Sequence, residues 1–245
     1  MKKALKIILI TIIVLIVLAG LLLWVLHSNG YSGLRTHTEP KDGQIKVACV
    51  GDSITYGHGI ASWSKNNYPT QLQGILGNGY HVANFGVSGA TLSSDGDLPY
   101  VSTKQYQLSL EYVPDILVLM LGTNDTKPQN WFDDIKFTLE MDKLVANYRS
   151  VNPKVKILLC TPAAAFYKDS SSQLTNFNIR PAIVLSVANG VKSYALSNMY
   201  KIEDIVDVYS LTETHPEWFS DYVHPNTEGA RAMAELVAQK ITKIK

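Results

Sequence analysis

One stretch of the chain is apolar at almost every position, and it restricts the possible folds more than any other feature. The stretch is Asp115–Leu121, which reads Asp-Ile-Leu-Val-Leu-Met-Leu and ends at Gly122. A strand with one face in water alternates apolar and polar side chains, whereas a strand buried on both faces shows no alternation. The stretch therefore predicts a strand inside a parallel sheet that helices cover on both sides.

Strand-like and helix-like segments alternate along the rest of the chain. The predicted strands are Ile45–Val50, His81–Phe85, Asp115–Leu121, Val155–Cys160 and Ile205–Tyr209. The predicted helices are Tyr68–Leu76, Asp133–Ser150, Gln173–Asn189 and Thr227–Ile244. The second helix carries residues at helical spacing at Ile135, Leu139, Leu144 and Tyr148. Such alternation is typical of a parallel sheet between two helical layers. Ligands of these sheets bind beyond the carboxyl ends of the strands, so chemistry is expected there.

The N-terminus has a different composition. Ile7–Leu26 contains 20 consecutive uncharged residues, after Lys2, Lys3 and Lys6. A helix of this length matches the hydrocarbon core of a bilayer. We expect residues 1–26 to be a single-pass membrane anchor with a cytoplasmic N-terminus, which places the rest of the chain outside the cell. A cleaved signal peptide is the alternative, although the apolar run is longer than is usual for one.

The remaining composition describes an ordinary globular domain. Residues 27–44 are rich in Ser, Gly, Thr and His and predict a linker, so the domain is expected at 45–245. The chain has 22 basic and 21 acidic residues, and without the three N-terminal lysines the acidic ones predominate. We therefore expect no nucleic-acid partner. Cys49 and Cys160 end two predicted strands and are expected to be free and buried. No metal site or cofactor is predicted.

The unusual residues follow the predicted strands. Gly51-Asp52-Ser53 follows the first strand, Asn84-Phe85-Gly86 closes the second, and Gly122-Thr123-Asn124-Asp125 follows the third. Asp221-Tyr222-Val223-His224 lies near the C-terminus. These four short motifs, in this order, resemble the SGNH (GDSL-type) hydrolase family, with Ser53, Gly86, Asn124 and His224 in the four positions of its name. The resemblance covers residues 46 to about 240.

The residue types agree with the resemblance on chemical grounds. Serine is a weak nucleophile and needs a neighbouring base, which His224 can provide near neutral pH. Asp221 precedes His224 by three residues, so its carboxylate can reach imidazole Nδ1 and stabilise the imidazolium. Ser53, Asp221 and His224 are therefore the predicted catalytic residues. Asp52 and Asp125 are expected to accept hydrogen bonds within tight loops rather than to catalyse.

The resemblance implies further properties. The fold would be a three-layer α/β/α sandwich around a mostly parallel, flavodoxin-like sheet of five strands. The oxyanion hole would consist of the N–H groups of Ser53 and Gly86 and the side-chain amide of Asn124. Tyr222 stands where many relatives carry a small residue, and we expect it to narrow the pocket without disturbing the catalytic contacts.

The motifs look most like the branch of sialate O-acetylesterases and acetylxylan-type esterases. We therefore expect a serine ester hydrolase that removes O-acetyl groups from carbohydrates. A lysophospholipase or other lipid esterase, and a sugar O-acetyltransferase, are alternatives that use the same site. A carbohydrate-binding module without activity is a further alternative, which the complete set of motif residues disfavours.

Overall fold

A five-stranded parallel sheet forms the centre of the domain. The computed structural model describes residues 2–28, 39–130, 133–169, 171–172, 174–175, 177–198 and 205–244. The strands are β1 (Ile45–Gly51), β2 (Tyr80–Gly86), β3 (Ile116–Met120), β4 (Lys156–Cys160) and β5 (Ile205–Val206). Their order in the sheet is β2-β1-β3-β4-β5, and every neighbouring pair is parallel. The predicted α/β fold with a five-stranded parallel sheet is confirmed.

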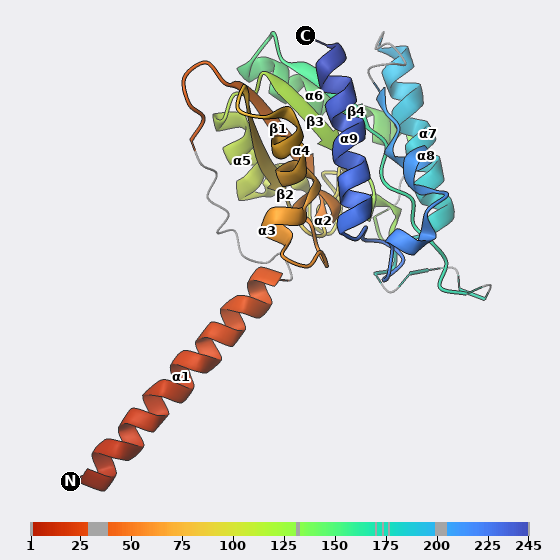
Figure 1. Ribbon diagram of the computed structural model, residues 1–245. Helices are drawn as coiled ribbons and strands as arrows, with labels where there is room; N and C mark the ends of the chain where they lie inside the picture. The colour runs from red at the N-terminus through yellow and green to blue at the C-terminus, as the bar shows by residue number, and fades with distance from the viewer. Residues whose placement is uncertain are drawn as a thin grey trace.

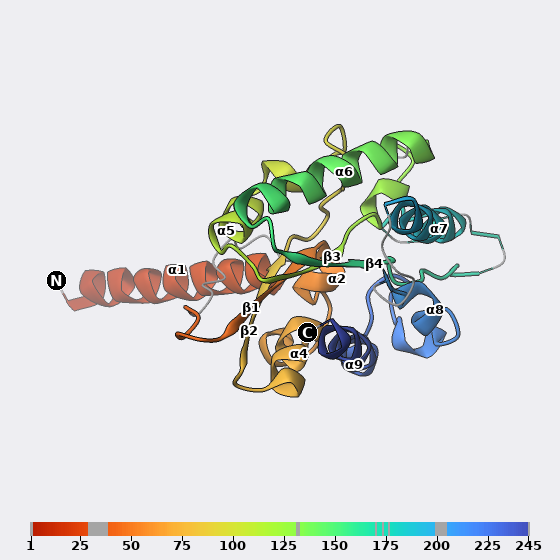
Figure 2. The ribbon, with the colours of Figure 1, turned by 90° about the horizontal axis from the view of Figure 1, so that it is seen from above.

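Helices cover both faces of the sheet (Figure 2). The longer helices of the domain are α4 (Tyr68–Leu76), α5 (Lys104–Glu111), α6 (Asp134–Val151), α7 (Pro181–Ser197) and α9 (Thr227–Lys243). Short helices are α2 (Ser53–Tyr56), α3 (Trp63–Asn66) and α8 (Val208–Thr212), with single 3-10 turns η1 (Tyr100–Ser102), η2 (Asn124–Thr126) and η4 (Pro216–Trp218). In Figure 2, α5, α6 and α7 lie on one side of the sheet, and α4 and α9 lie on the other.

Side chains of the central strands alternate between two hydrophobic cores. Val47 of β1 and Val118 of β3 point toward the core under α4 and α9. Ala48 of β1 and Leu117 of β3 point toward the core under α5, α6 and α7. All four side chains have no exposed surface. Burial on both faces explains why Asp115–Leu121 lacks polar alternation. The free, buried cysteines are also as predicted, because β3 separates β1 from β4.

One helix prediction is wrong in position, and in another helix only Leu144 and Tyr148 of the four spaced residues are buried. The helix expected at 173–189 is α7, which begins at Pro181. Proline is favoured in the first turn of a helix and disrupts the interior, so a helix passing through Pro181 was the wrong assignment. In α6, Ile135 and Leu139 are 75% and 53% exposed, and Phe137 and Met141 face the core instead. The predicted strand 205–209 ends at Val206, and its last residues start α8.

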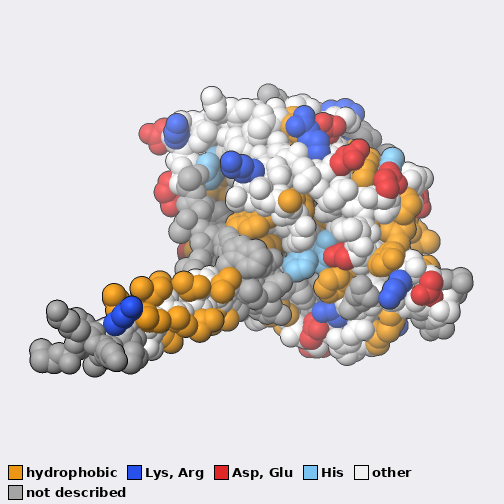
Figure 3. Space-filling model, turned by 60° about the horizontal axis from the view of Figure 1, so that its bottom comes forward, with side chains coloured by type: hydrophobic (Ala, Val, Ile, Leu, Met, Phe, Trp, Pro, Cys, Tyr) orange, Lys and Arg blue, Asp and Glu red, His pale blue; other side chains and the backbone are white. Residues whose placement is uncertain are grey.

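The N-terminal helix α1 (Lys2–Ser28) projects away from the domain (Figure 1). Every residue from 9 to 22 is exposed, and hydrophobic side chains cover this part of the helix (Figure 3). Within the described residues, no helix is both long enough and apolar enough to cross a membrane. The predicted transmembrane helix is therefore not supported by the structure. Most of the predicted linker 27–44 lies outside the described residues.

Candidate active site

The first strand and the first short helix position Ser53. β1 ends at Gly51, and the Asp52 side chain caps α2 by accepting a hydrogen bond from the N–H of Ile54 at 2.9 Å. Ser53 is the first residue of α2, where backbone N–H groups lack partners within the helix. The local acceptor role predicted for Asp52 is confirmed. The serine side chain lies at the carboxyl end of the sheet, on the wall of a pocket of about 730 Å³. Histidine side chains are visible near the middle of this face (Figure 3).

The turn before α9 brings His224 to this serine. Nε2 of His224 lies 2.8 Å from Oγ of Ser53, although 171 positions separate the two residues. Nδ1 of His224 donates to Oδ2 of Asp221 at 2.8 Å. The other carboxylate oxygen, Oδ1, accepts hydrogen bonds from the backbone N–H groups of Val223 and His224. Asp221 thus holds both the imidazole ring and the turn that carries it.

The carboxylate of Asp221 is fit for this contact. Burial would raise its pKa, but the hydrogen bond and charge of His224 lower it more, so the pKa of Asp221 falls to about 2. The carboxylate is therefore ionised at any pH at which the protein works, and it can stabilise a protonated imidazole. Tyr222 adopts a positive φ of 71° between the two residues, and it is not among the residues that line the pocket. The expected contacts of Asp221 and His224 form, whereas the expected narrowing of the pocket by Tyr222 is not seen.

Two of the three predicted oxyanion donors line the pocket. Asn124 follows β3 in the turn η2, and its Nδ2 donates to the carbonyl of Ala90 at 3.1 Å. An amide nitrogen carries two hydrogens, so one remains for a ligand. The N–H of Ser53 has no acceptor among the described residues. Ser53 and Asn124 are only 7% and 6% exposed, which reduces solvent competition for hydrogen bonds in the pocket.

The third predicted donor, Gly86, lies elsewhere. Gly86 is the last residue of β2, pairs with Gly51, and is not among the pocket-lining residues. Its N–H already donates to Oδ1 of Asn84 at 2.9 Å. The geometry does not support Gly86 as an oxyanion donor. Gly89 lines the pocket instead, with a φ of +85° that favours glycine and an N–H that meets no acceptor in the described part of the chain.

A family comparison agrees with this arrangement. Residues 49–232 match the model of the GDSL-like lipase/acylhydrolase family. This match includes every residue of the site described above. The chain belongs to that family. Its members act on ester bonds, so the protein is an enzyme of an esterase family.

Individual relatives of this GDSL-like chain carry similar names. A protein described as an acetylxylan esterase from Xylanibacter ruminicola is 36% identical over 226 residues, which is 85% of this chain and 45% of that protein. The chain therefore spans less than half of that relative's length. A solved acetyl xylan esterase has a TM-score of 0.58 at 26% identity, covering 82% of this chain and 99% of the other. A carbohydrate acetylesterase family member from Sinorhizobium meliloti has a TM-score of 0.66 at 23% identity, covering 82% and 99%.

Two aromatic side chains that the sequence did not assign to the site also line this pocket. The ring of His58 lies 4.5 Å from that of His224, and Phe177 contacts both rings edge-on. Burial first, and then the charge of His224, lower the pKa of His58, which favours the neutral form of this imidazole beside the base. The position of His58 five residues after Ser53 was the available signal. Phe177 follows no motif, and only the folded chain brings it to the pocket.

The two glycines allow a direct test of the corrected assignment. A Cβ at Gly86 would lie 2.3 Å from the backbone N of Tyr56, whereas a Cβ at Gly89 would meet only Leu98 at 3.7 Å. Gly86→Ala should therefore destabilise the fold by about 1–3 kcal/mol or more, through overpacking against backbone. Gly89→Ala should cost less, about 1–2 kcal/mol from its left-handed backbone. Urea unfolding measures both. Equal stability of Gly86→Ala and the wild type, with lost activity, would return Gly86 to a catalytic role.

Proposed function

We propose that this protein is a serine carboxylic-ester hydrolase that removes acetyl groups from carbohydrates. The observation that carries the hydrolysis is the hydrogen-bonded series of Ser53, His224 and Asp221 on the wall of a pocket. Each contact is 2.8 Å, which is within the reach needed for proton transfer.

In the first half-reaction, Oγ of Ser53 attacks the acetyl carbonyl while Nε2 of His224 takes the hydroxyl proton. The imidazolium that forms is stabilised by the ionised Asp221 at Nδ1. His224 then gives the proton to the oxygen of the departing sugar, which leaves as a free alcohol. In the second half-reaction, water attacks the acetyl-serine while His224 takes a proton from it. The bond from Oγ to the acyl carbon breaks, His224 returns the proton to Oγ of Ser53, and acetate is released.

The negative charge that develops on the carbonyl oxygen needs hydrogen-bond donors already in place. We assign this role to the N–H groups of Ser53 and Gly89 and to the side-chain amide of Asn124. All three residues line the same pocket. The first-turn position of Ser53 also contributes, because unpartnered N–H groups at the start of a helix favour negative charge.

Asn124→Ala should lower kcat by roughly 10²–10³-fold, as expected for one lost oxyanion donor. KM should change much less, because the donor acts on the transition state rather than on the bound ester. Steady-state kinetics on 4-nitrophenyl acetate measure the two constants. A rise in KM with unchanged kcat would instead assign Asn124 to ground-state binding of the substrate.

Two observations support a short acyl group and a carbohydrate alcohol. The names of the relatives described above include acetylxylan esterase and carbohydrate acetylesterase. The hydrophobic side chains that line the pocket are those of Phe177, Ile179 and Val223, and the other lining residues are polar, charged or glycine. This lining suits a ligand with many hydroxyl groups, and only three of its described side chains are hydrophobic ones that a long acyl chain could pack against.

The chain length of the acyl group tests this substrate class. Each methylene buried in an apolar acyl pocket should contribute up to ~0.8 kcal/mol. We expect kcat/KM on nitrophenyl esters to peak at acetate and to fall steeply by octanoate. Acetate release from acetylated xylan should accompany this profile. A profile that rises toward octanoate would identify a lipid esterase with the same serine mechanism.

A sugar O-acetyltransferase differs only in the acceptor of the second half-reaction. Product analysis with added acceptor sugar separates the two, since a hydrolase yields acetate and a transferase yields a new sugar ester.

The location of the catalytic domain outside the cell stays a prediction from the lysines and the apolar segment near the N-terminus. Protease added to intact cells should digest the domain. Protection of the domain in intact cells, with digestion after lysis, would contradict this location.

A further inference from the structure

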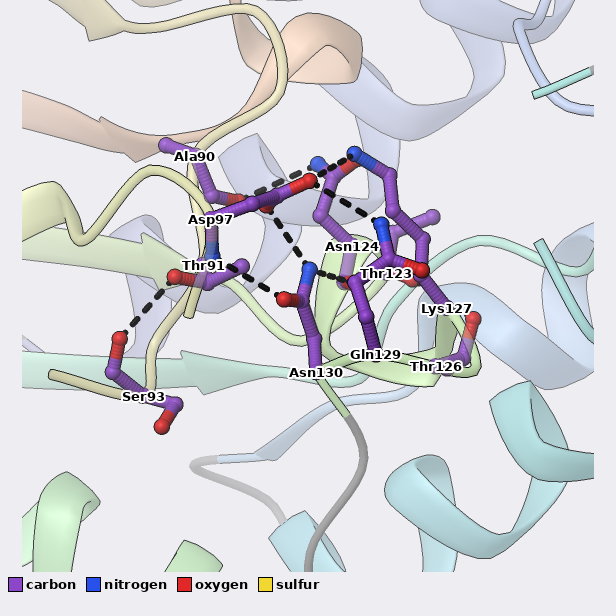
Figure 4. A network of polar contacts seen from close by, with 10 residues as sticks. All are labelled: Ala90, Thr91, Ser93, Asp97, Thr123, Asn124, Thr126, Lys127, Gln129 and Asn130. Atoms are coloured by element: carbon purple, nitrogen blue, oxygen red, sulfur yellow. Dashed lines mark hydrogen bonds and ion pairs between the residues drawn. The ribbon is translucent and has the colours of Figure 1, made fainter. Parts of the chain in front are cut away.

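One part of the pocket wall is a polar cluster that the catalytic steps do not use. It consists of Asp97, Lys127 and Gln129, which all line the same pocket as Ser53. Oδ2 of Asp97 accepts hydrogen bonds from Lys127 Nζ at 3.1 Å and from Gln129 Nε2 at 3.3 Å. We call these three residues the Asp97 cluster. Figure 4 shows that they come from two loops, the one after β2 and the one after β3.

A buried asparagine fixes this cluster relative to the catalytic residues. Asn130 is 6% exposed, and its Nδ2 donates both to Oδ1 of Asp97 at 2.7 Å and to the carbonyl of Asn124 at 3.0 Å. Its Oδ1 accepts the N–H of Asp97 at 2.9 Å (Figure 4). The Asp97 cluster is therefore held at a defined position beside the predicted oxyanion donor. A site that is ordered in advance loses little entropy when it binds a ligand.

The cluster keeps unused hydrogen-bonding capacity of both kinds. An ammonium group has three N–H donors, and a side-chain amide has two N–H donors and an acceptor oxygen. Among the described residues, Lys127 Nζ and Gln129 Nε2 each have Asp97 as their side-chain partner. Further N–H groups of both, and Oε1 of Gln129, remain for a ligand in the pocket. A hydroxyl group both donates and accepts hydrogen bonds, so adjacent hydroxyls suit such a mixed set.

The charges of the cluster select for a neutral ligand. Lys127 and Asp97 form an ion pair at 3.1 Å, with side chains 15% and 38% exposed. Burial raises the pKa of Asp97, but hydrogen bonds from Asn130 and Lys127 lower it further than burial raises it, so the carboxylate stays ionised. The lysine charge is thus balanced within the protein. A ligand carboxylate beside Lys127 would also meet the like charge of Asp97.

We propose that Asp97, Lys127 and Gln129 form a subsite that binds hydroxyl groups of a neutral sugar, next to the acetyl group under attack. This proposal rests on the proposed carbohydrate acetylesterase function and names the part of the pocket that recognises the alcohol. Lys127 lies three residues after the oxyanion donor Asn124, and its N–H donates to the carbonyl of Asn124 at 3.2 Å. This contact fixes the subsite next to the oxyanion donor.

The test compares two acetates that share the acyl group and differ in the alcohol. Wild type, Lys127→Met and Gln129→Leu are assayed on acetylated xylo-oligosaccharide and on 4-nitrophenyl acetate. The ratio of kcat/KM on the sugar ester to that on the nitrophenyl ester should fall about tenfold or more for Lys127→Met, which loses a hydrogen bond of a charged group. It should fall about twofold to tenfold for Gln129→Leu, which loses one of a neutral amide. The fall should appear mainly in KM for the sugar ester.

Lys136→Met is the matched control. Lys136 forms an ion pair with Asp95 on the same loop at 2.6 Å, but neither residue lines the pocket. This variant should leave the ratio unchanged, because it breaks a comparable ion pair away from the site.

Four outcomes decide the proposal. A fall in the ratio for the two pocket variants alone supports it. Equal losses on both substrates would overturn it, because they would mean that the cluster only positions Asn124. An unchanged ratio in active variants would also overturn it. If the wild type hydrolyses the nitrophenyl ester but releases no acetate from any acetylated carbohydrate, the proposed function itself fails and the subsite with it.

A separate experiment tests the preference for a neutral sugar. Acetylated xylan and an acetylated polyuronate of similar acetyl content are compared with the wild type and with Lys127→Met. We expect the wild type to prefer the neutral polymer. A wild-type preference for the polyuronate that Lys127→Met abolishes would instead identify a carboxylate subsite at Lys127 and would overturn the neutral-sugar proposal.

Discussion

Ser53→Ala should lower kcat for ester hydrolysis by roughly 10³–10⁶-fold, the range expected when a member of a catalytic triad is lost. Oγ of Ser53 is the nucleophilic atom, and it lies 2.8 Å from Nε2 of the predicted base. His224→Ala should cost about as much, because the residues of a triad act as a unit. Acetate release under saturating substrate measures both variants.

The fold should survive the change at Ser53. The substitution removes one hydroxyl, whose hydrogen-bond partner among the described residues is the side chain of His224, and leaves the capping bond from Asp52 in place. Ser64→Ala, at an exposed serine of α3, is the matched control and should retain full activity. Near-normal activity in a folded Ser53→Ala protein would remove the basis of the proposed function.

Asp125→Ala should lower the free energy of unfolding by about 2–6 kcal/mol, the largest loss of stability that we expect. Asp125 is fully buried, and its two carboxylate oxygens accept the N–H groups of Leu92 and Ser93 at 2.9 and 2.8 Å. Alanine would leave both donors buried without a partner, at about 1–3 kcal/mol each. Urea unfolding gives the value. Asp95→Ala, at an exposed acid of the loop that carries Leu92 and Ser93, is the control and should change stability little.

Asp125→Asn removes the titrating group and keeps one of the two acceptor oxygens, so one of the two hydrogen bonds is lost. Burial raises the pKa of Asp125 from 3.8 to about 6. A carboxyl with a raised pKa stabilises the folded state when protonated, so its contribution is complete below 3.8 and is lost as the pH rises through about 6. Asparagine does not titrate. The stability of Asp125→Asn relative to wild type should therefore improve between pH 4 and pH 7. A constant difference would contradict the raised pKa.

Local pattern was sufficient for the strands of the sheet and for the helices α4, α6 and α9, whereas α5 was not predicted. Asp115–Leu121 predicted the central strand because a strand buried on both faces needs apolar side chains on both. The helix at Tyr68–Leu76 has the predicted bounds, with Pro69 in its first turn. In both segments, the side-chain pattern and the backbone preferences lead to the same structure.

The errors occur where local pattern leaves several arrangements open. Ile135 and Leu139 have helical spacing, but so do Phe137 and Met141 on an adjacent face of the same helix. The sheet decides which face is buried, and it selects the second pair. The error in the start of α7 has another cause. Pro181 is a signal for a helix start that is visible in the sequence, but the prediction placed it inside the helix.

The glycine assignment shows the same division within the site. Gly86 is the last residue of β2 and Gly89 follows three residues later, and both suit a close backbone approach. The two glycines differ in their N–H groups. The N–H of Gly86 donates to Oδ1 of Asn84, whereas that of Gly89 has no acceptor among the described residues. That contact and the packing of Tyr56 against Gly86 exist only in the folded chain.

The sequence by itself determined the fold class, the family and the residues proposed for catalysis, because strand patterns and short motifs are local properties. Tertiary structure decided which glycine faces the pocket, and it brought His58, Phe177 and the Asp97 cluster to its wall. Pocket walls form from loops that follow different strands, and their side chains meet only when a parallel sheet brings the carboxyl ends of those strands to one edge.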